Sequence, residues 1–133
     1  MNSLTSGPAA ALWVGLHILL LLVLSVRVVR LRRRHKVALG DGGHPDLAQA
    51  IRAFGNATEY APIGLIGLVL LAQLGALPLA IHLGGLLLFV GRLVHAIGLS
   101  NSGGASLPRA VGMLVSWIAF VFIAAVLLIY AIV

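Results

Sequence analysis

Four long apolar segments occupy most of this 133-residue chain and restrict the folds it can adopt. They run over about residues 8–29, 47–74, 78–99 and 108–133, and each is close to the roughly 20 residues that span a bilayer as a helix. Segments of this length are too long for barrel strands, and in lipid a helix satisfies its own backbone groups. The sequence therefore predicts an all-α, integral membrane four-helix bundle that forms a single domain over residues 1–133.

The composition supports a membrane protein and excludes several kinds of site. Of the residues, 61% are hydrophobic and 9% are charged, whereas a soluble domain carries about 25% charged residues. The chain has no cysteine, which rules out a disulfide framework, a thiolate metal site and a cysteine nucleophile. We predict no metal site. The net charge of +6 lies mostly beside one apolar segment, and this position favours a role in topology or lipid contact over binding of nucleic acid.

A basic segment follows the first apolar run and predicts the orientation of the chain. Residues 27–36, RVVRLRRRHK, carry six cations, whereas the GALP turn after the second run carries none. We expect a basic loop over about residues 30–46. By the positive-inside rule this loop and the third loop face the cytoplasm, so both termini lie on the opposite side. The main role expected for the basic segment is to set topology and to contact the phosphates of membrane lipids.

Polar residues concentrate at the start of the second segment, in RAFGNATEY. On a helix, Arg52, Asn56, Glu59 and Tyr60 fall within about 100° of one another. Pro62 follows and removes one backbone hydrogen bond, so a kink is expected there. The antiparallel order of the spans brings three further residues to the same cytoplasmic half: Arg92, His95 and Arg109.

Charge balance suggests what this group of residues could bind. A charged side chain in the membrane interior costs roughly 2.5 to 3.5 kcal/mol on insertion scales, so such groups pair or bind something charged. Glu59 is the one acid expected within the spans, and arginines outnumber it. The sequence favours a buried pocket for an anionic molecule. The alternative is that Arg52, Glu59 and Arg92 only form interhelical pairs, and His95 by itself is more typical of a packing histidine.

Glycines recur every seven residues in the third segment, at Gly84, Gly91 and Gly98. Such a stripe lets another helix approach closely, either within one subunit or between subunits. Gly64 and Gly67 can serve the same purpose in the second segment. Four helices of this length form a thin bundle, and a charged pocket is more easily enclosed between protomers, so we expect a homo-oligomer.

Three stretches of the chain resemble a known family. RAFGNATEYAP resembles the second-helix signature of the MAPEG family (membrane-associated proteins in eicosanoid and glutathione metabolism). GRLVHAIG is similar to the third-helix motif of that family. LRRRHKVALGDGGHPDLAQAIRA is similar to the first cytoplasmic loop of its bacterial branch. The resemblance covers nearly the whole chain and implies a protein of the bacterial inner membrane.

The resemblance also implies a ligand and an assembly. Family members are homotrimers that bind glutathione between neighbouring protomers, in the cytoplasmic half. Carried over by position, Arg109 would stabilise the thiolate of glutathione. The positions implied to bind the tripeptide are Arg33 (or a neighbour in the first loop), Arg52, Asn56, Glu59, Tyr60, Arg92 and His95.

The activity implied by this resemblance is that of a glutathione transferase or peroxidase. Its second substrate would be a hydrophobic electrophile that enters from the lipid. One position departs from several eukaryotic members, because Leu99 stands where they carry a tyrosine. Two alternatives remain open: a non-catalytic binding or scaffold protein of the same fold, and a small proton-coupled multidrug exporter with Glu59 as its coupling acid. The excess of cations around Glu59 argues against the exporter.

Overall fold

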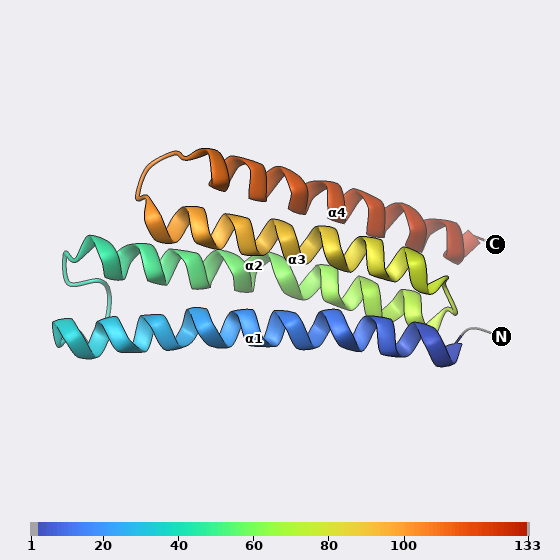
Figure 1. Ribbon diagram of the computed structural model, residues 1–133, viewed down its shortest axis with the longest axis horizontal. Coiled ribbons are helices and arrows are strands. Elements are labelled where there is room, and N and C mark those ends of the chain that lie inside the picture. Colours follow the sequence, from blue (N-terminus) through green and yellow to red (C-terminus); the bar gives the residue numbers. More distant parts are fainter. Residues whose placement is uncertain (1–2, 133) are drawn as a thin grey trace.

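The computed structural model describes residues 3–132, which form four helices lying side by side (Figure 1). The helices are α1 (Ser3–His35), α2 (Pro45–Gln73), α3 (Pro78–Asn101) and α4 (Leu107–Ile132). All four are long and apolar enough to cross a membrane, and no strand occurs within residues 3–132. The predicted all-α membrane bundle is confirmed. Both chain ends lie at the same end of the bundle, opposite the α1–α2 connector.

Prolines begin three of the helices. Pro45 and Pro78 are the first residues of α2 and α3, and Pro108 is in the first turn of α4. Proline suits this position because its missing N–H would have no intrahelical partner there. The residue before α2, His44, makes no side-chain cap bond. α2 therefore begins with a proline in its first turn and without a side-chain cap.

The basic segment is helical, which corrects the loop expected over residues 30–46. α1 continues to His35, and its last turn contains Arg32, Arg33 and Arg34. Arginine is a good helix former, and cations are favourable near a helix C-terminus. The helix ends where Lys36 adopts a left-handed φ of 56°. The connector to α2 is therefore shorter than expected and holds residues 36–44.

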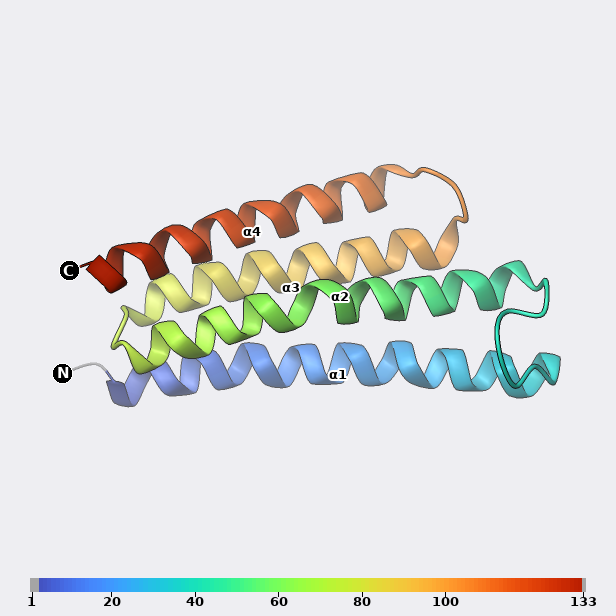
Figure 2. The same cartoon turned by 180° about the vertical axis from the view of Figure 1, so that it is seen from behind.

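The two central helices are α2 and α3, and the other two lie on either side of them (Figure 2). α1 packs against α2 and α3, and α4 packs against the same two helices. Within residues 3–132, no Cα atoms of α1 and α4 come within 8 Å of each other. The bundle is thus open, with α1 and α4 as separate edges.

Glycines in α3 allow α4 to approach closely, as the sequence predicted. A Cβ atom added at Gly91 would lie 2.8 Å from the Ser116 backbone nitrogen, and one at Gly98 would lie 2.7 Å from that of Arg109. Contacts this short exclude any side chain unless the helices move apart. The stripe therefore serves packing within the subunit. Gly64 serves packing likewise, since its added Cβ would lie 2.5 Å from Leu88.

The course of α2 changes direction near its middle, as Figure 2 shows. Pro62 lies inside the helix there. Proline lacks an N–H and its ring crowds the preceding turn, so a bend at this point is the expected result. The first half of α2, which carries the polar residues, is thus set at an angle to its apolar second half.

A buried histidine joins α1 to α3 in the apolar part of the bundle. His17 is fully buried, and its Nδ1 lies 2.7 Å from the Trp13 carbonyl oxygen. Its ring meets Phe89 edge-on, at 5.3 Å between centroids. The Nε2 atom has no hydrogen-bond partner within the described chain. A buried polar atom without a partner costs about 1 to 3 kcal/mol, so His17 weakens the bundle at this point.

We expect His17→Leu to raise the free energy of unfolding by about 1 kcal/mol, because leucine removes the unpartnered Nε2 and keeps a similar volume. Thermal unfolding of the purified protein in detergent would measure the change. His82→Leu is the matched control. It removes the acceptor of the Trp13 Nε1–H, whose distance to His82 Nδ1 is 3.2 Å, so no gain is expected there. A lower stability of His17→Leu would contradict this account.

Candidate anion-binding site

A buried arginine is the centre of the polar residues inside the bundle. The side chain of Arg92, in α3, is 1% exposed. Its Nε donates to Ser116 Oγ at 2.9 Å, and its Nη1 donates to Asn56 Oδ1 at 2.6 Å. Its guanidinium carbon lies 4.7 Å from the centroid of the Tyr60 ring. We call Asn56, Tyr60, Arg92 and Ser116 the Arg92 cluster; it joins α2, α3 and α4.

The local sequence of each helix explains this geometry. Asn56 and Tyr60 are four residues apart in α2, so both point to the same side of that helix. Ser116 comes close to Arg92 because Gly91 and Gly112 let α3 and α4 approach. The Ser116 hydroxyl donates to the Gly112 carbonyl at 2.8 Å, so its oxygen lone pair is free to accept from Arg92.

The positive charge of Arg92 has no carboxylate partner within residues 3–132. The ion pairs of this part of the chain join His35 to Asp46 and Arg52 to Glu59. The remaining group, Nη2, donates to the sulfur of Met113, at 3.7 Å. Neutral acceptors and an aromatic face therefore stabilise a buried cation whose charge stays uncompensated. An anion bound beside this arginine would compensate it.

The predicted polar face of α2 is divided in the structure. Asn56 is buried and points to Arg92, together with Tyr60. Arg52 and Glu59 instead lie on the surface of the subunit, 3.5 Å apart, with 59% and 54% of their side chains exposed. The two pairs differ in exposure because of their angular positions around α2. Arg52 and Glu59 are on one edge of the polar face, and Asn56 and Tyr60 are on the other.

The depth of Glu59 makes its exposure costly for an isolated subunit. Glu59 is the fifteenth residue of the 29-residue α2, so it lies roughly 20 Å along the helix. A charged side chain facing hydrocarbon at mid-membrane is strongly unfavourable. The weak pairing with Arg52 compensates only part of this cost. The surface that carries this pair therefore requires a cover other than lipid chains.

The other predicted site residues lie apart from the Arg92 cluster. His95 is buried in α3, one turn beyond Arg92, with its backbone against Gly112. Arg109, in α4, donates to the Gly104 carbonyl of the α3–α4 loop. Arg33 is exposed in the last turn of α1. Within residues 3–132, no hydrogen bond or ion pair joins any of these three residues to Arg92.

Arg52 lines a small groove beside the α3–α4 loop. Its volume is about 210 Å³, and its lining residues are Pro45, Ala48, Gln49, Arg52, Leu99 and Gly103. Leu99 is buried here, at the position where the sequence departed from the family pattern. Since Arg109 contacts the next residue of the loop, Gly104, the two arginines approach the same loop from different helices.

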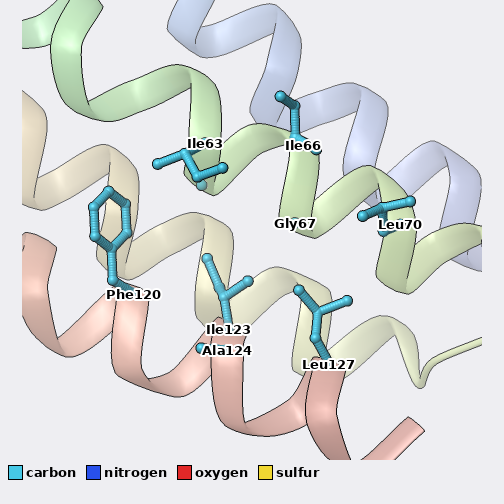
Figure 3. A pocket seen from close by; sticks show the side chains of 9 residues that line it. Ile63, Ile66, Gly67, Leu70, Phe120, Ile123, Ala124 and Leu127 are labelled. Atoms are coloured by element: carbon cyan, nitrogen blue, oxygen red, sulfur yellow. The ribbon is translucent and has the colours of Figure 1, made fainter. Parts of the chain in front are cut away.

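An apolar groove lies between α2 and α4 (Figure 3). Its volume is about 270 Å³, and its walls include Ile63, Gly67, Ile123 and Leu127. Phe120 lines it and also stacks on Tyr60, at 6.0 Å between ring centroids. Phe120 therefore links the wall of the groove to Tyr60 of the Arg92 cluster.

Sequence reasoning missed Ser116. This serine is fully buried and holds the Nε of Arg92. A signal was present, because Ser116 is the one hydroxyl-bearing residue in the apolar run from 110 to 129. A polar residue inside a membrane helix usually faces the protein interior, where it finds a partner.

Fold and site together define a class of protein: a four-helix membrane protein with a buried arginine between three of its helices. Within residues 3–132 this arginine has no carboxylate partner. The model of the MAPEG family matches residues 10–129. The chain therefore belongs to the MAPEG family, as its motifs indicated.

Two curated proteins of known sequence are similar to this chain. The "Inner membrane protein YecN" of Escherichia coli (strain K12) is 44% identical over 89 residues, which cover 67% of this chain and 68% of the relative. The protein of the same name from Escherichia coli O6:H1 has the same identity and coverage.

Proposed function

We propose that this protein binds glutathione within the membrane and transfers it to hydrophobic electrophiles. One observation carries the proposal: Arg92 is a buried cation without a carboxylate partner within residues 3–132. Membership of the MAPEG family supports the identity of the anion. The name of the Escherichia coli relatives supports a location in a bacterial inner membrane.

The charges of glutathione complement the residues described above. The tripeptide has two carboxylates, one ammonium and one thiol. Arginine binds carboxylates through two parallel hydrogen bonds and stays protonated when buried. In the proposed complex, Arg92 and Arg52 bind the carboxylates and Glu59 binds the ammonium. Asn56 and Tyr60 hold the Arg92 guanidinium in place, as they do in the free subunit.

A homotrimer would provide the cover that Arg52 and Glu59 require. These side chains are more than half exposed on a single subunit, although α2 is a membrane helix. A neighbouring protomer packed over them would remove the carboxylate from lipid and enclose the ligand between subunits. In this arrangement the basic end of the bundle, with residues 27–44, faces the cytoplasm, and both termini face away from it.

The proposed reaction needs the thiolate form of glutathione. The sulfur gives its proton to water and then attacks the electrophilic carbon, whose leaving group departs with the bonding electrons. In a peroxidase reaction the thiolate would attack one peroxide oxygen, the O–O bond would break, and the other oxygen would leave as an alkoxide or hydroxide that takes a proton from water. A second glutathione would then attack the resulting sulfenic acid, giving the disulfide and water. A nearby cation favours the thiolate, and we assign this task to Arg109. The apolar groove between α2 and α4 is where a hydrophobic electrophile can approach from the lipid.

A titration of the purified protein with glutathione, followed by conjugation to a generic aromatic electrophile, tests the proposal. We expect Arg109→Ala to slow conjugation by at least about tenfold, the change in thiolate fraction for one unit of thiol pKa. Arg109→Lys, which keeps a cation, should recover part of the rate. Equal rates for the wild type and Arg109→Ala would show that Arg109 does not stabilise the thiolate. Failure to bind millimolar glutathione would contradict the proposed function as a whole.

A non-catalytic binding protein of the same fold is the second candidate. Leu99 is buried at the loop groove. Several eukaryotic family members carry a tyrosine at this position, so this chain has no phenol there to assist the chemistry. The two candidates differ in one result. A binding protein would take up glutathione and show no conjugation above the uncatalysed rate, with either residue at position 109.

A further inference from the structure

A groove on the surface of α1 combines an apolar wall with two arginines. Its volume is about 490 Å³, and its lining residues are Leu22, Val23, Val26, Arg27 and Arg30. We call it the α1 groove. The apolar residues are open to the surroundings, with Leu22 55% and Val23 65% exposed. The arginines lie at the end toward the α1–α2 connector, where the membrane span meets its basic boundary.

The cations of this groove differ in how they are held. The Nη2 of Arg27 donates to the Ser100 carbonyl oxygen at 3.1 Å, so the α3 helix fixes the position of its guanidinium. Arg30 is exposed and makes no ion pair within residues 3–132. The two arginines are three residues apart, which places them on the same side of α1.

Charge is not balanced along this part of the chain. The segment from residue 27 to residue 36 contains six cations and no acid. In the described chain its one ion pair is that of His35 with Asp46, at 2.9 Å. An anion is therefore the complementary ligand for Arg27 and Arg30, and the apolar wall beside them requires a hydrocarbon chain.

We propose that the α1 groove binds an anionic phospholipid. The phosphate lies between Arg27 and Arg30, and an acyl chain runs along Val26, Val23 and Leu22 toward the membrane centre. The helix rises about 6 Å over the four steps from position 22 to position 26, which matches a segment of several methylene groups. A net negative headgroup is preferred, because the ammonium of a zwitterionic headgroup would meet the arginines.

This proposal is independent of the glutathione site. None of the residues of the α1 groove belongs to the Arg92 cluster, and α1 does not contact α4 within the described chain. Glutathione binding could therefore fail in every assay while the lipid preference persists, or the reverse.

Native mass spectrometry would test the proposal on the intact protein. The protein is equilibrated in detergent with equal amounts of phosphatidylglycerol and phosphatidylcholine that carry identical acyl chains. We expect the wild type to retain phosphatidylglycerol several-fold more than phosphatidylcholine. Arg30→Gln should lower this ratio several-fold. Val26→Trp should also reduce phosphatidylglycerol retention, since it fills the apolar wall and leaves every cation in place.

Lys36→Gln is the matched control, because it removes the same charge from the same segment but lies outside the groove. It should leave the lipid ratio unchanged. Equal retention of the two lipids by the wild type would overturn the proposal. A loss in Lys36→Gln as large as that in Arg30→Gln would also overturn it, since attraction would then come from the basic segment as a whole.

Discussion

Replacing Arg92 with leucine is expected to weaken glutathione binding by on the order of 30-fold or more, since removal of one member of a buried, hydrogen-bonded charge pair costs about 2 to 5 kcal/mol. Arg92 is 1% exposed and is held by Asn56 and Ser116, so no other cation can take its place. Isothermal titration in detergent would measure the loss. If Arg92→Leu binds glutathione with unchanged affinity, Arg92 does not contact the ligand.

The same variant should remain folded, which makes the binding result interpretable. Leucine removes a cation that has no carboxylate partner in the described chain, and it also leaves the Asn56 amide oxygen without its donor. These effects oppose each other, because a buried charge is costly and an unpaired buried oxygen costs about 1 to 3 kcal/mol. Thermal unfolding without glutathione should therefore be close to that of the wild type. Met113→Leu, which removes only a sulfur contact of 3.7 Å, should bind glutathione normally.

Replacing Gly91 with alanine should have a large effect on stability. The new Cβ would lie 2.5 Å from Ser116 Oγ and 2.8 Å from the Ser116 backbone nitrogen, and the backbone cannot move aside as a flexible side chain can. We expect a loss of about 3 kcal/mol, at the upper end of the usual cost of overpacking. Displacement of Ser116 should also lower affinity for glutathione. Thermal unfolding and the same titration would measure both effects.

Gly15→Ala provides the control for this substitution. Gly15 lies inside α1, and an added Cβ would meet no atom within 4 Å. Alanine is a better helix former than glycine by about 1 kcal/mol, so this variant should be as stable as the wild type or more so. If the two alanine variants unfold at the same temperature, the close approach of α3 and α4 does not contribute to stability.

The sequence was sufficient for the helices and for part of the site. Lengths of apolar sequence predicted the four spans, because this signal is local. The spacing of Asn56 and Tyr60 placed them on one side of α2, and Arg92 meets that side in the structure. The prediction of a loop over residues 30–46 was wrong, because α1 continues to His35. The apolar pattern ends at the edge of the lipid, whereas a helix can extend beyond it.

Partners between helices could not be predicted from the sequence. Ser116 reaches Arg92 only through the register of α3 and α4, which Gly91 and Gly112 set by their backbones. Arg52 and Glu59 are exposed while Asn56 is buried and Tyr60 half-buried because of how α2 is rotated about its own axis. A rotation smaller than the roughly 100° between successive residues decides which of them face the interior. Such rotations result from packing of whole helices, and no local motif encodes them.

The separation of α1 from α4 limits how copies of this chain can associate. A subunit with α1 on one side and α4 on the other has two unlike edges. A two-fold contact joins like surfaces, so it would cover one edge and leave the other against lipid. A heterologous contact joins the α1 edge of one copy to the α4 edge of the next. Repeated by a rotation that closes, it forms a ring in which both edges of every subunit take part in contacts.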